Sequence, residues 1–231
     1  MLSSNFTRLL LKVFFGIIIL VTACNCNQPP ISPTVTPSPP EADLSSAQGS
    51  KKKITSDKIT SDVVLATPRD DIKGLPNFAK VSDVLYRGAQ PAKEGLAELK
   101  KMGIKTIINL RSFHSDKDEL KGLGLQYLNI ECDAADIKEE NAVIFLKVVT
   151  NSSNQPVFVH CQHGSDRTGL MVAIYRIYIQ GWNKEDAIKE SDNFGMHKIY
   201  KNIPEYIKNF DIEKIKLKVK TAPEPKIELI E

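Results

Sequence analysis

The sequence predicts a single α/β domain with a central mixed or parallel sheet flanked by helices. From about residue 77 to residue 210, short runs of β-branched and other apolar residues alternate with segments whose apolar residues recur at helical spacing. Such alternation favours strands joined by helices that cover the sheet. The chain has 231 residues, 42% hydrophobic and 26% charged, which is a globular composition and excludes a disordered chain.

The domain is expected to open with a hairpin and a helix. Residues 78–80 and 84–86 predict short strands around a turn at Ser82 and Asp83. Residues 91–102 predict a helix, because they start with proline, repeat apolar residues at helical spacing and precede a glycine that ends the helix.

Three strands and two helices are expected next. The β-branched run 104–110 predicts a buried strand, and the polar residues 116–121, with glycines just after them, predict a short helix. Residues 125–130 predict the next strand. The apolar stripe of 138–150 predicts a longer helix, and 156–160 predict a short strand that leads directly into a loop.

The last elements are a central helix and one further helix. Residues 168–180 are apolar on nearly every face, so this helix is expected at the centre of the domain. Asn183 is placed to cap a helix that starts near Lys184, with Asp186 in its first turn. Residues 213–231 are interpreted as a C-terminal tail, because lysines alternate with apolar residues as in an edge strand or extended segment before two prolines.

The N-terminal residues predict export. Residues 1–23 combine a basic start with an apolar run of signal-peptide length, shorter than the ~20 residues of a spanning helix. Val21-Thr-Ala-Cys24 resembles the bacterial lipobox, which implies lipid attachment at Cys24; an uncleaved anchor and ordinary signal cleavage are the alternatives. Residues 24–74 are rich in Pro, Ser and Thr and predict a flexible linker. We therefore expect a membrane-anchored lipoprotein of the bacterial cell envelope, periplasmic or on the outer surface.

Charge and cysteine usage exclude two other classes of protein. The formal net charge of +3 falls to +1 once Arg8 and Lys12 leave with the signal peptide, so nothing indicates nucleic-acid binding. The four cysteines show no paired spacing and the four histidines are scattered, so no metal site is expected.

Chemistry-bearing residues gather in the loop between the strand 156–160 and the helix 168–180. This loop reads His160-Cys-Gln-His-Gly-Ser-Asp-Arg-Thr-Gly169. At the N-terminus of a helix, unsatisfied amides and a nearby arginine favour the thiolate of Cys161. The same amides form a nest for a three-oxygen anion, and the planar fork of Arg167 matches two phosphate oxygens. One loop thus combines a nucleophile with an anion site.

The loop resembles the His-Cys-x5-Arg-Ser/Thr motif of the cysteine-dependent protein phosphatases. Residues 85–91, 107–111 and 168–182 are similar to the atypical dual-specificity branch, over about residues 77–210. The resemblance implies a phosphatase domain over 75–212, with the active-site loop between a strand and the central helix. The classical tyrosine-specific branch requires a considerably larger domain, so this chain is too short to belong to it.

The resemblance also implies roles for individual residues. Cys161 attacks phosphorus and forms a phosphocysteine, and no metal or cofactor is required. Arg167 binds the phosphate oxygens, while His160 orients the cysteine and Thr168 helps to expel the thiolate. The remaining phosphate-binding residues are Gln162, His163, Gly164, Ser165 and Asp166.

The sequence leaves open whether the general acid is one of two aspartates or neither of them. The family takes this group from a loop upstream of the cysteine, where Asp133 and Asp136 are the candidates; a helix-capping turn is the structural alternative. Arg87 and Arg111 each follow a short apolar run. For each of them there are two alternatives: it lends charge to the site, or it forms a surface ion pair.

Other side chains near the loop have weaker assignments. His114 and His197 are expected at the surface or at helix ends. A reversible disulfide between Cys132 and Cys161 is a further hypothesis, since an exported thiolate is readily oxidised.

The loop favours a monophosphate ester as substrate. Asp166 adds negative charge beside the phosphate, which disfavours polyanions. We expect phosphotyrosine or phosphoserine/threonine of a protein, or a small phosphoester. An inositol-phosphate or phosphoinositide substrate is the alternative within enzymes, and a weakly active phosphate-binding module is the alternative outside them. Five residues between Cys161 and Arg167 argue against a sulfurtransferase, whose loop is typically shorter.

Overall fold

The computed structural model describes residues 63–231. The predicted signal peptide, Cys24 and most of the predicted linker lie outside the described residues. Within residues 63–231, no helix combines the length and the apolar character needed to cross a bilayer.

The predicted central sheet is present and is mixed. In the described residues it has six strands in the order β1-β2-β5-β3-β4-β6. Its four inner strands are parallel to one another, and the two edge strands are antiparallel to their neighbours. The strands are β1 (Ala79–Lys80), β2 (Leu85–Gly88), β3 (Thr106–Asn109), β4 (Leu125–Asn129), β5 (Val157–His160) and β6 (Glu228–Ile230).

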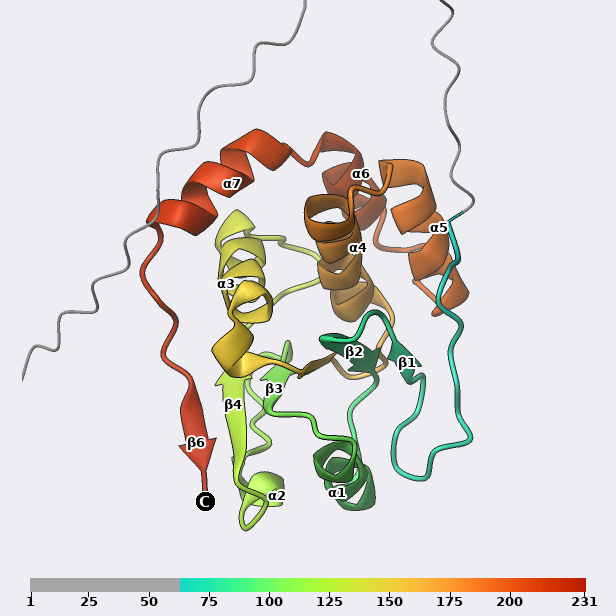
Figure 1. Cartoon of the computed structure of the whole chain (residues 1–231). Helices are drawn as coiled ribbons and strands as arrows, with labels where there is room; N and C mark the ends of the chain where they lie inside the picture. The colour runs from blue at the N-terminus through green and yellow to red at the C-terminus, as the bar shows by residue number, and fades with distance from the viewer. Residues whose placement is uncertain (1–62) are drawn as a thin grey trace, which may run out of the picture. The chain divides into compact units, whose positions relative to one another are not determined.

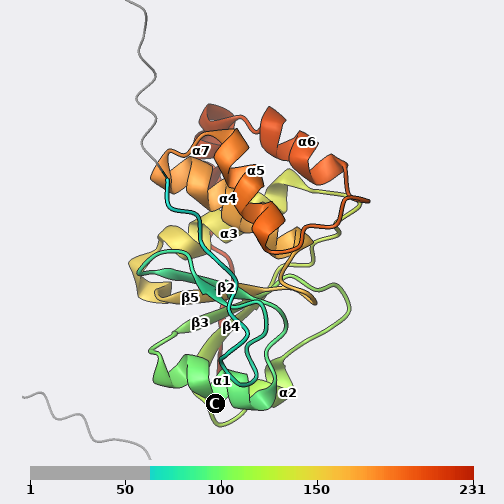
Figure 2. The ribbon, with the colours of Figure 1, turned by 90° about the vertical axis from the view of Figure 1, so that its right-hand side faces the viewer.

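Helices cover both faces of the sheet (Figures 1 and 2). Helices α1 (Lys93–Lys101) and α2 (Lys117–Leu120) lie on one face and close the smaller apolar core. The other face carries the larger core beneath five helices. They are α3 (Glu139–Thr150), α4 (Asp166–Gln180), α5 (Lys184–Asn193), α6 (Asn202–Asn209) and α7 (Ile212–Thr221).

The local signals in the sequence predict several element boundaries correctly. Helix α1 ends before Gly103, which has a φ of +82°. The Asn183 side chain caps α5 by accepting a hydrogen bond from the Asp186 backbone. Helix α4 is buried along most of its length, as expected of a central helix, but it starts at Asp166, two residues earlier than predicted.

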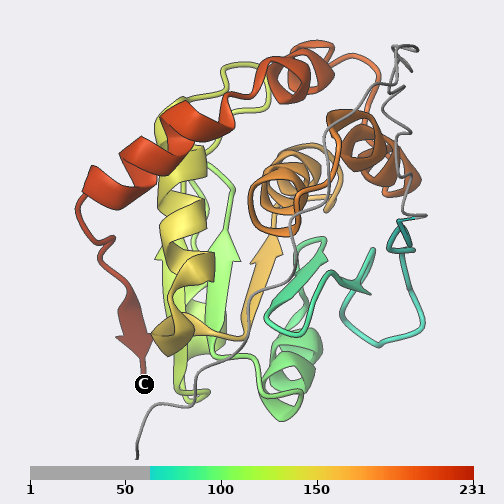
Figure 3. The same ribbon diagram turned by 45° about the horizontal axis from the view of Figure 1, so that its top comes forward.

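The prediction of a C-terminal tail is wrong. Residues 212–221 form α7, which runs along α3 (Figure 3). Its buried face is apolar around Ile215, while Lys214 and Lys218 form ion pairs with Glu139 of α3. The edge strand lies farther along the chain than the sequence indicates. It is β6, which follows the two prolines and pairs with β4. The domain therefore extends beyond residue 212.

The domain also makes contacts before residue 75. Arg69 pairs with Phe78 through two backbone hydrogen bonds, and the backbone N–H of Ala66 donates to Glu190 of α5. Gly74 lies so close to α1 that a Cβ on Gly95 would stand 2.0 Å from its carbonyl oxygen. The last residues of the predicted linker thus lie against the domain.

Candidate active site

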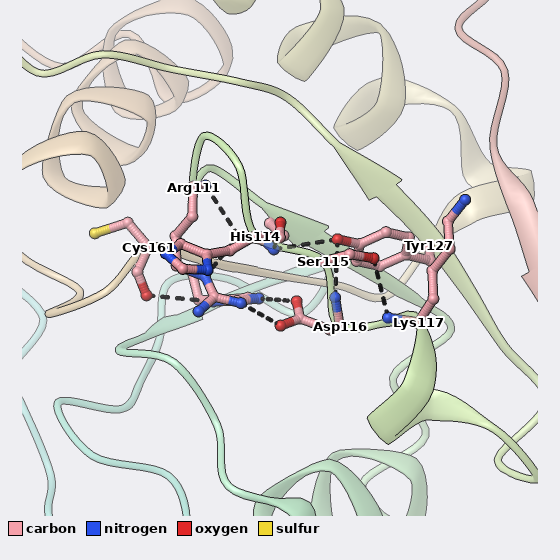
Figure 4. A network of polar contacts seen from close by, with 9 residues as sticks. Arg111, His114, Ser115, Asp116, Lys117, Tyr127 and Cys161 are labelled. Carbon is pink, nitrogen blue, oxygen red and sulfur yellow. Dashed lines mark hydrogen bonds and ion pairs between the residues drawn. The ribbon is translucent and has the colours of Figure 1, made fainter.

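The Cys161 loop lies at the carboxyl ends of the parallel strands, where α/β sheets commonly bind ligands. Strand β5 is buried between β2 and β3 and delivers Cys161 directly at its end. Cys161 is buried, with 2% of the residue exposed. Its sulfur points away from the polar network on the other side of the loop (Figure 4). The loop then enters α4, so its backbone amides stand at the N-terminus of the central helix.

Gly164 allows the loop to fold tightly against β2. Its φ is +72°, and a Cβ there would lie 2.6 Å from the Ala89 nitrogen and the Gly88 carbonyl carbon. Only glycine satisfies both conditions. Gly164, which the sequence predicts to bind phosphate, is thus required for the conformation of its backbone.

Arg87 supports this turn from inside the domain. It is fully buried, and its Nη2 donates a 2.7 Å hydrogen bond to the carbonyl of Gly164. Its guanidinium lies 3.6 Å from the ring centroid of Phe194. Burial lowers the pKa of Arg87 to about 9, although the charges of Glu190 and Cys161 act to raise it. The alternative of a surface ion pair at Arg87 is wrong.

A second buried network lies beneath the cysteine (Figure 4). Arg111 Nη2 donates to Asp116 Oδ1 at 2.5 Å, and His160 Nε2 lies 2.9 Å from Asp116 Oδ2. His160 Nδ1 lies 3.3 Å from the Cys161 carbonyl oxygen. Both side chains of the Arg111–Asp116 pair are almost completely buried, so Arg111 does not form a surface ion pair either.

Sequence reasoning missed Asp116 and the residues around it. Asn109 accepts from the backbone N–H and the Nε of Arg111. The Asn109 amide also donates to the hydroxyl of Tyr127, and that hydroxyl accepts from the Asp116 backbone N–H. Asp116 stood out in the sequence only as the start of a short helix. Its partner His160 is 44 residues away, so no local signal indicates the contact.

A cleft of about 630 Å³ opens over the loop. Of the predicted site residues, it brings together Arg111, Asp133, Gln162, His163, Asp166 and Arg167. His114 and His197 also line it, and both are exposed, as the sequence predicts. The other lining residues are Ser112, Phe113, Cys132, Ala134, Ile199 and Tyr200.

The two candidate general acids differ in position. Asp133 lines the cleft and accepts a 2.9 Å hydrogen bond from the backbone N–H of Ala135. Asp136 is exposed and does not line the cleft. It does not cap α3 either, because the N-cap residue of that helix is Lys138. The geometry therefore favours Asp133.

Asp166 does not present a bare negative charge to the cleft. Its two carboxylate oxygens contact the backbone N–H of His197 at 2.7 Å and the Nδ1 of His197 at 2.8 Å. The ring of His163 lies edge-on to that of His197, with 5.9 Å between centroids. Asp166 is therefore expected to repel polyanions less strongly than the sequence alone suggests.

Cys132 and Thr168 are buried near the loop. Both Cys132 and Cys161 are free thiols, and burial raises the pKa of Cys132 against the opposing effects of Asn141 and Arg167. The regulatory disulfide stays a prediction. In the part of the chain that the structure describes, the buried Thr168 hydroxyl has no hydrogen-bond partner, and its role in expelling the thiolate stays a prediction.

Comparison with known proteins places the chain among phosphatases. The sequence model of the tyrosine phosphatase family matches residues 74–227. The dual specificity protein phosphatase TpbA of Pseudomonas aeruginosa is 30% identical over 146 residues, covering 61% of this chain and 66% of that protein. The inositol diphosphatase DSP5 of Arabidopsis thaliana is 26% identical over 149 residues, covering 61% of this chain and 72% of that protein.

Solved structures agree with this similarity. A crystal structure of P. aeruginosa TpbA matches with a TM-score of 0.60 and 27% identity, covering 68% of this chain and 97% of that one. A TpbA variant in complex with pTyr matches with a TM-score of 0.60 and 25% identity, covering 71% of this chain and all of that one. Since the family model covers well over half of the chain, and Cys161 and Arg167 bracket a loop between a buried strand and the central helix, this chain belongs to the tyrosine phosphatase family.

Proposed function

We propose that the protein hydrolyses phosphate monoesters through a phosphocysteine intermediate, with phosphorylated tyrosine, serine or threonine of proteins, or small phosphoesters, as substrates. The observation that carries this proposal is the loop from Cys161 to Arg167, which joins a nucleophile to an anion cradle. Gln162, His163, Asp166 and Arg167 of this loop line the cleft. The match to TpbA, which has been crystallised with pTyr, supports the same chemistry.

The reaction proceeds in two displacements. In the first, the Cys161 sulfur attacks phosphorus, the bond from phosphorus to the ester oxygen breaks, and Asp133 donates its proton to that oxygen. Arg167 and the loop amides bind the equatorial oxygens throughout. In the second, Asp133 removes a proton from water, the water oxygen attacks phosphorus, and the sulfur–phosphorus bond breaks. The Thr168 hydroxyl stabilises the departing thiolate.

An inositol-phosphate substrate is the second candidate. Three histidines line the cleft, and the negative charge of Asp166 is bonded to one of them, His197. Both features reduce the repulsion of a polyanion. The similarity to an inositol diphosphatase points the same way.

A comparison of substrates and variants tests the proposal. Residues 63–231, under reductant and without added metal, are assayed on para-nitrophenyl phosphate, a phosphotyrosyl peptide, a phosphoseryl peptide and an inositol polyphosphate. We expect turnover by the wild type and none by Cys161→Ser. Asp133→Asn is expected to lower kcat by about 10²–10⁴-fold, with Asp136→Asn as the matched control near wild type.

The outcomes separate the candidates. Preference for the inositol polyphosphate would replace the protein-phosphatase reading. A folded wild type that binds phosphate but is inert on all four substrates would indicate a phosphate-binding module instead.

We also propose that the protein is exported and anchored by a lipid at Cys24. The support is the signal-peptide pattern of residues 1–23 and the lipobox-like residues before the cysteine. Full-length protein expressed in bacteria is expected to incorporate labelled fatty acid and to partition into detergent. Cys24→Ala is expected to abolish both, and an unlabelled wild type would refute the anchor.

A further inference from the structure

Residues 131–136 form a loop without regular secondary structure between β4 and α3. We call it the Asp133 loop, because it carries the side chain that the proposed mechanism uses as general acid. The position of this loop decides whether the acid reaches the ester oxygen of a bound substrate. Two asparagine side chains, Asn141 of α3 and Asn202 of α6, donate hydrogen bonds to its backbone.

The contact made by Asn202 reaches the Asp133 carboxylate through a single peptide group. The Nδ2 of Asn202 donates a 2.7 Å hydrogen bond to the carbonyl of Ala134. The N–H of that same peptide group belongs to Ala135, and it donates a 2.9 Å hydrogen bond to Oδ1 of Asp133. A donor on the carbonyl fixes the plane of the peptide group and, by polarising it, strengthens its N–H as a donor. The chain of contacts therefore runs from α6 through one peptide group to the carboxylate.

The Asn202 side chain is directed to the Asp133 loop and not to its own helix. Asparagine at a helix start commonly caps the helix through its side-chain oxygen, but the N-cap residue of α6 is Lys201. The amide of Asn202 instead donates to the loop, with a second and longer contact of 3.4 Å to the carbonyl of Ala135. Its helix is a firm support, because the next residue, Ile203, is fully buried in the larger core and α6 packs against α4 and α5.

From these contacts we infer that Asn202 is a positioning residue of the reaction. It orients the peptide group between residues 134 and 135, which holds Oδ1 of Asp133 so that Oδ2 carries the proton to the ester oxygen. This inference rests on the proposed function and deepens it, since it names a residue outside the Cys161 loop on which proton transfer depends. Asn202 does not line the cleft, so it acts on the reaction through Asp133.

Two aryl phosphates that differ in their need for an acid test the inference. The para-nitrophenolate anion is a good leaving group, whereas the phenolate released from phenyl phosphate depends strongly on protonation. Asn202→Ala is expected to lower kcat/KM for phenyl phosphate by about tenfold, which is part of the about 10²–10⁴-fold that a positioned acid contributes. For para-nitrophenyl phosphate, kcat/KM is expected to change by less than about threefold.

A second variant keeps the test decisive if Asn202→Ala disturbs folding. Asn202→Asp has the shape of the natural side chain but presents only acceptors to the Ala134 carbonyl. A carboxylate in the first turn of α6 favours the helix, so this variant is expected to fold. It is expected to show at least the same selective loss on phenyl phosphate. The matched control is Asn209→Ala at the exposed other end of α6, which is expected to match the wild type on both esters.

A double variant shows whether the effect passes through the carboxylate. Once Asp133→Asn has removed the acid, Asn202→Ala is expected to cause no further loss on phenyl phosphate. An additive loss would overturn the inference. An equal loss on both esters would also do so, because it would make Asn202 a support of the whole fold. Unchanged kcat/KM for phenyl phosphate in both Asn202 variants would be equally decisive against it.

Hydrogen exchange distinguishes a failure of this inference from a failure of the proposed function. An inactive wild type refutes the proposed function, but exchange of the Ala135 amide is measured without turnover. Its exchange is expected to be about tenfold faster in Asn202→Ala and Asn202→Asp than in the wild type, and unchanged in Asn209→Ala. Equal exchange in all of these proteins would overturn the inference, whatever their activity.

Discussion

Removal of Asp116 is expected to destabilise the domain more than any exposed charge change nearby. Asp116→Leu leaves Arg111 without its counter-charge at a position where both side chains are only 5–6% exposed. Breaking a buried pair from one side costs about 3–5 kcal/mol, a large share of the about 5–15 kcal/mol that stabilises a typical domain. The loss should appear as a lower urea midpoint with an unchanged m-value.

A second substitution gives this prediction its sharpest test. In Asp116→Leu with Arg111→Met, no uncompensated guanidinium remains, so the double variant is expected to be more stable than Asp116→Leu alone. Arg111→Met alone is expected to cost less than Asp116→Leu, because His160 still contacts the carboxylate of Asp116. The matched control is Asp118→Ala on α2, whose ion pair with Lys121 is exposed and whose loss should leave the midpoint unchanged. The reasoning is refuted if Asp116→Leu costs no more than Asp118→Ala, or if Arg111→Met adds to the damage.

Three further predictions concern the loop and the domain around it. Gly164→Ala is expected to abolish activity and lower the melting temperature, whereas Gly122→Ala, which has a similar positive φ but open space, should only lower stability by about 1–2 kcal/mol. Burial raises the pKa of Tyr206 to about 12, so stability should fall as pH rises from about 10 to 12, and less so in Tyr206→Phe by urea titration. His197→Ala removes the partner of Asp166, and the inhibition constant of phosphate should rise; an unchanged constant would contradict the pairing.

The elements that the sequence predicts well depend on local chemistry. A glycine with positive φ ends α1, and an asparagine side chain caps α5. These signals lie within a few residues of the boundary that they specify, so no tertiary information is needed. The same holds for the Cys161 loop, whose residues are contiguous in the sequence.

The C-terminal helix shows where local patterns fail. Residues 214–220 alternate lysine with apolar residues, as a strand would, but Ile212, Ile215 and Val219 also lie on one face of a helix. The apolar face and Glu139 of α3 favour the helix. The exposed Leu217 is the residue that the strand reading would have placed beside Ile215 and Val219. A short amphipathic segment satisfies both periods, and its packing partner selects one.

For a related reason, the sequence could not predict which buried side chains hold the Cys161 loop in place. Asp116 meets His160 because β3 and β5 are adjacent, and Arg87 meets Gly164 because β2 lies on the other side of β5. Strand order is a property of the whole fold. From the sequence, each of these residues is an isolated charge near the end of a strand or helix.

Arg87 indicates what the domain gains from such a buried charge. Lowering its pKa from 12.5 to about 9 disfavours the cation by about 5 kcal/mol. The hydrogen bond to Gly164 and the contact with Phe194 return about 2 kcal/mol each, so Arg87→Met should leave the free energy of unfolding within about 1–2 kcal/mol of wild type. The same change removes the one side-chain hydrogen bond that holds Gly164, in the described residues, so kcat is expected to fall by more than tenfold, on the scale of about 10²-fold for a misplaced site. A variant that loses stability but keeps its kcat would instead make Arg87 a residue of the core, because a positioning role predicts the opposite pair of results.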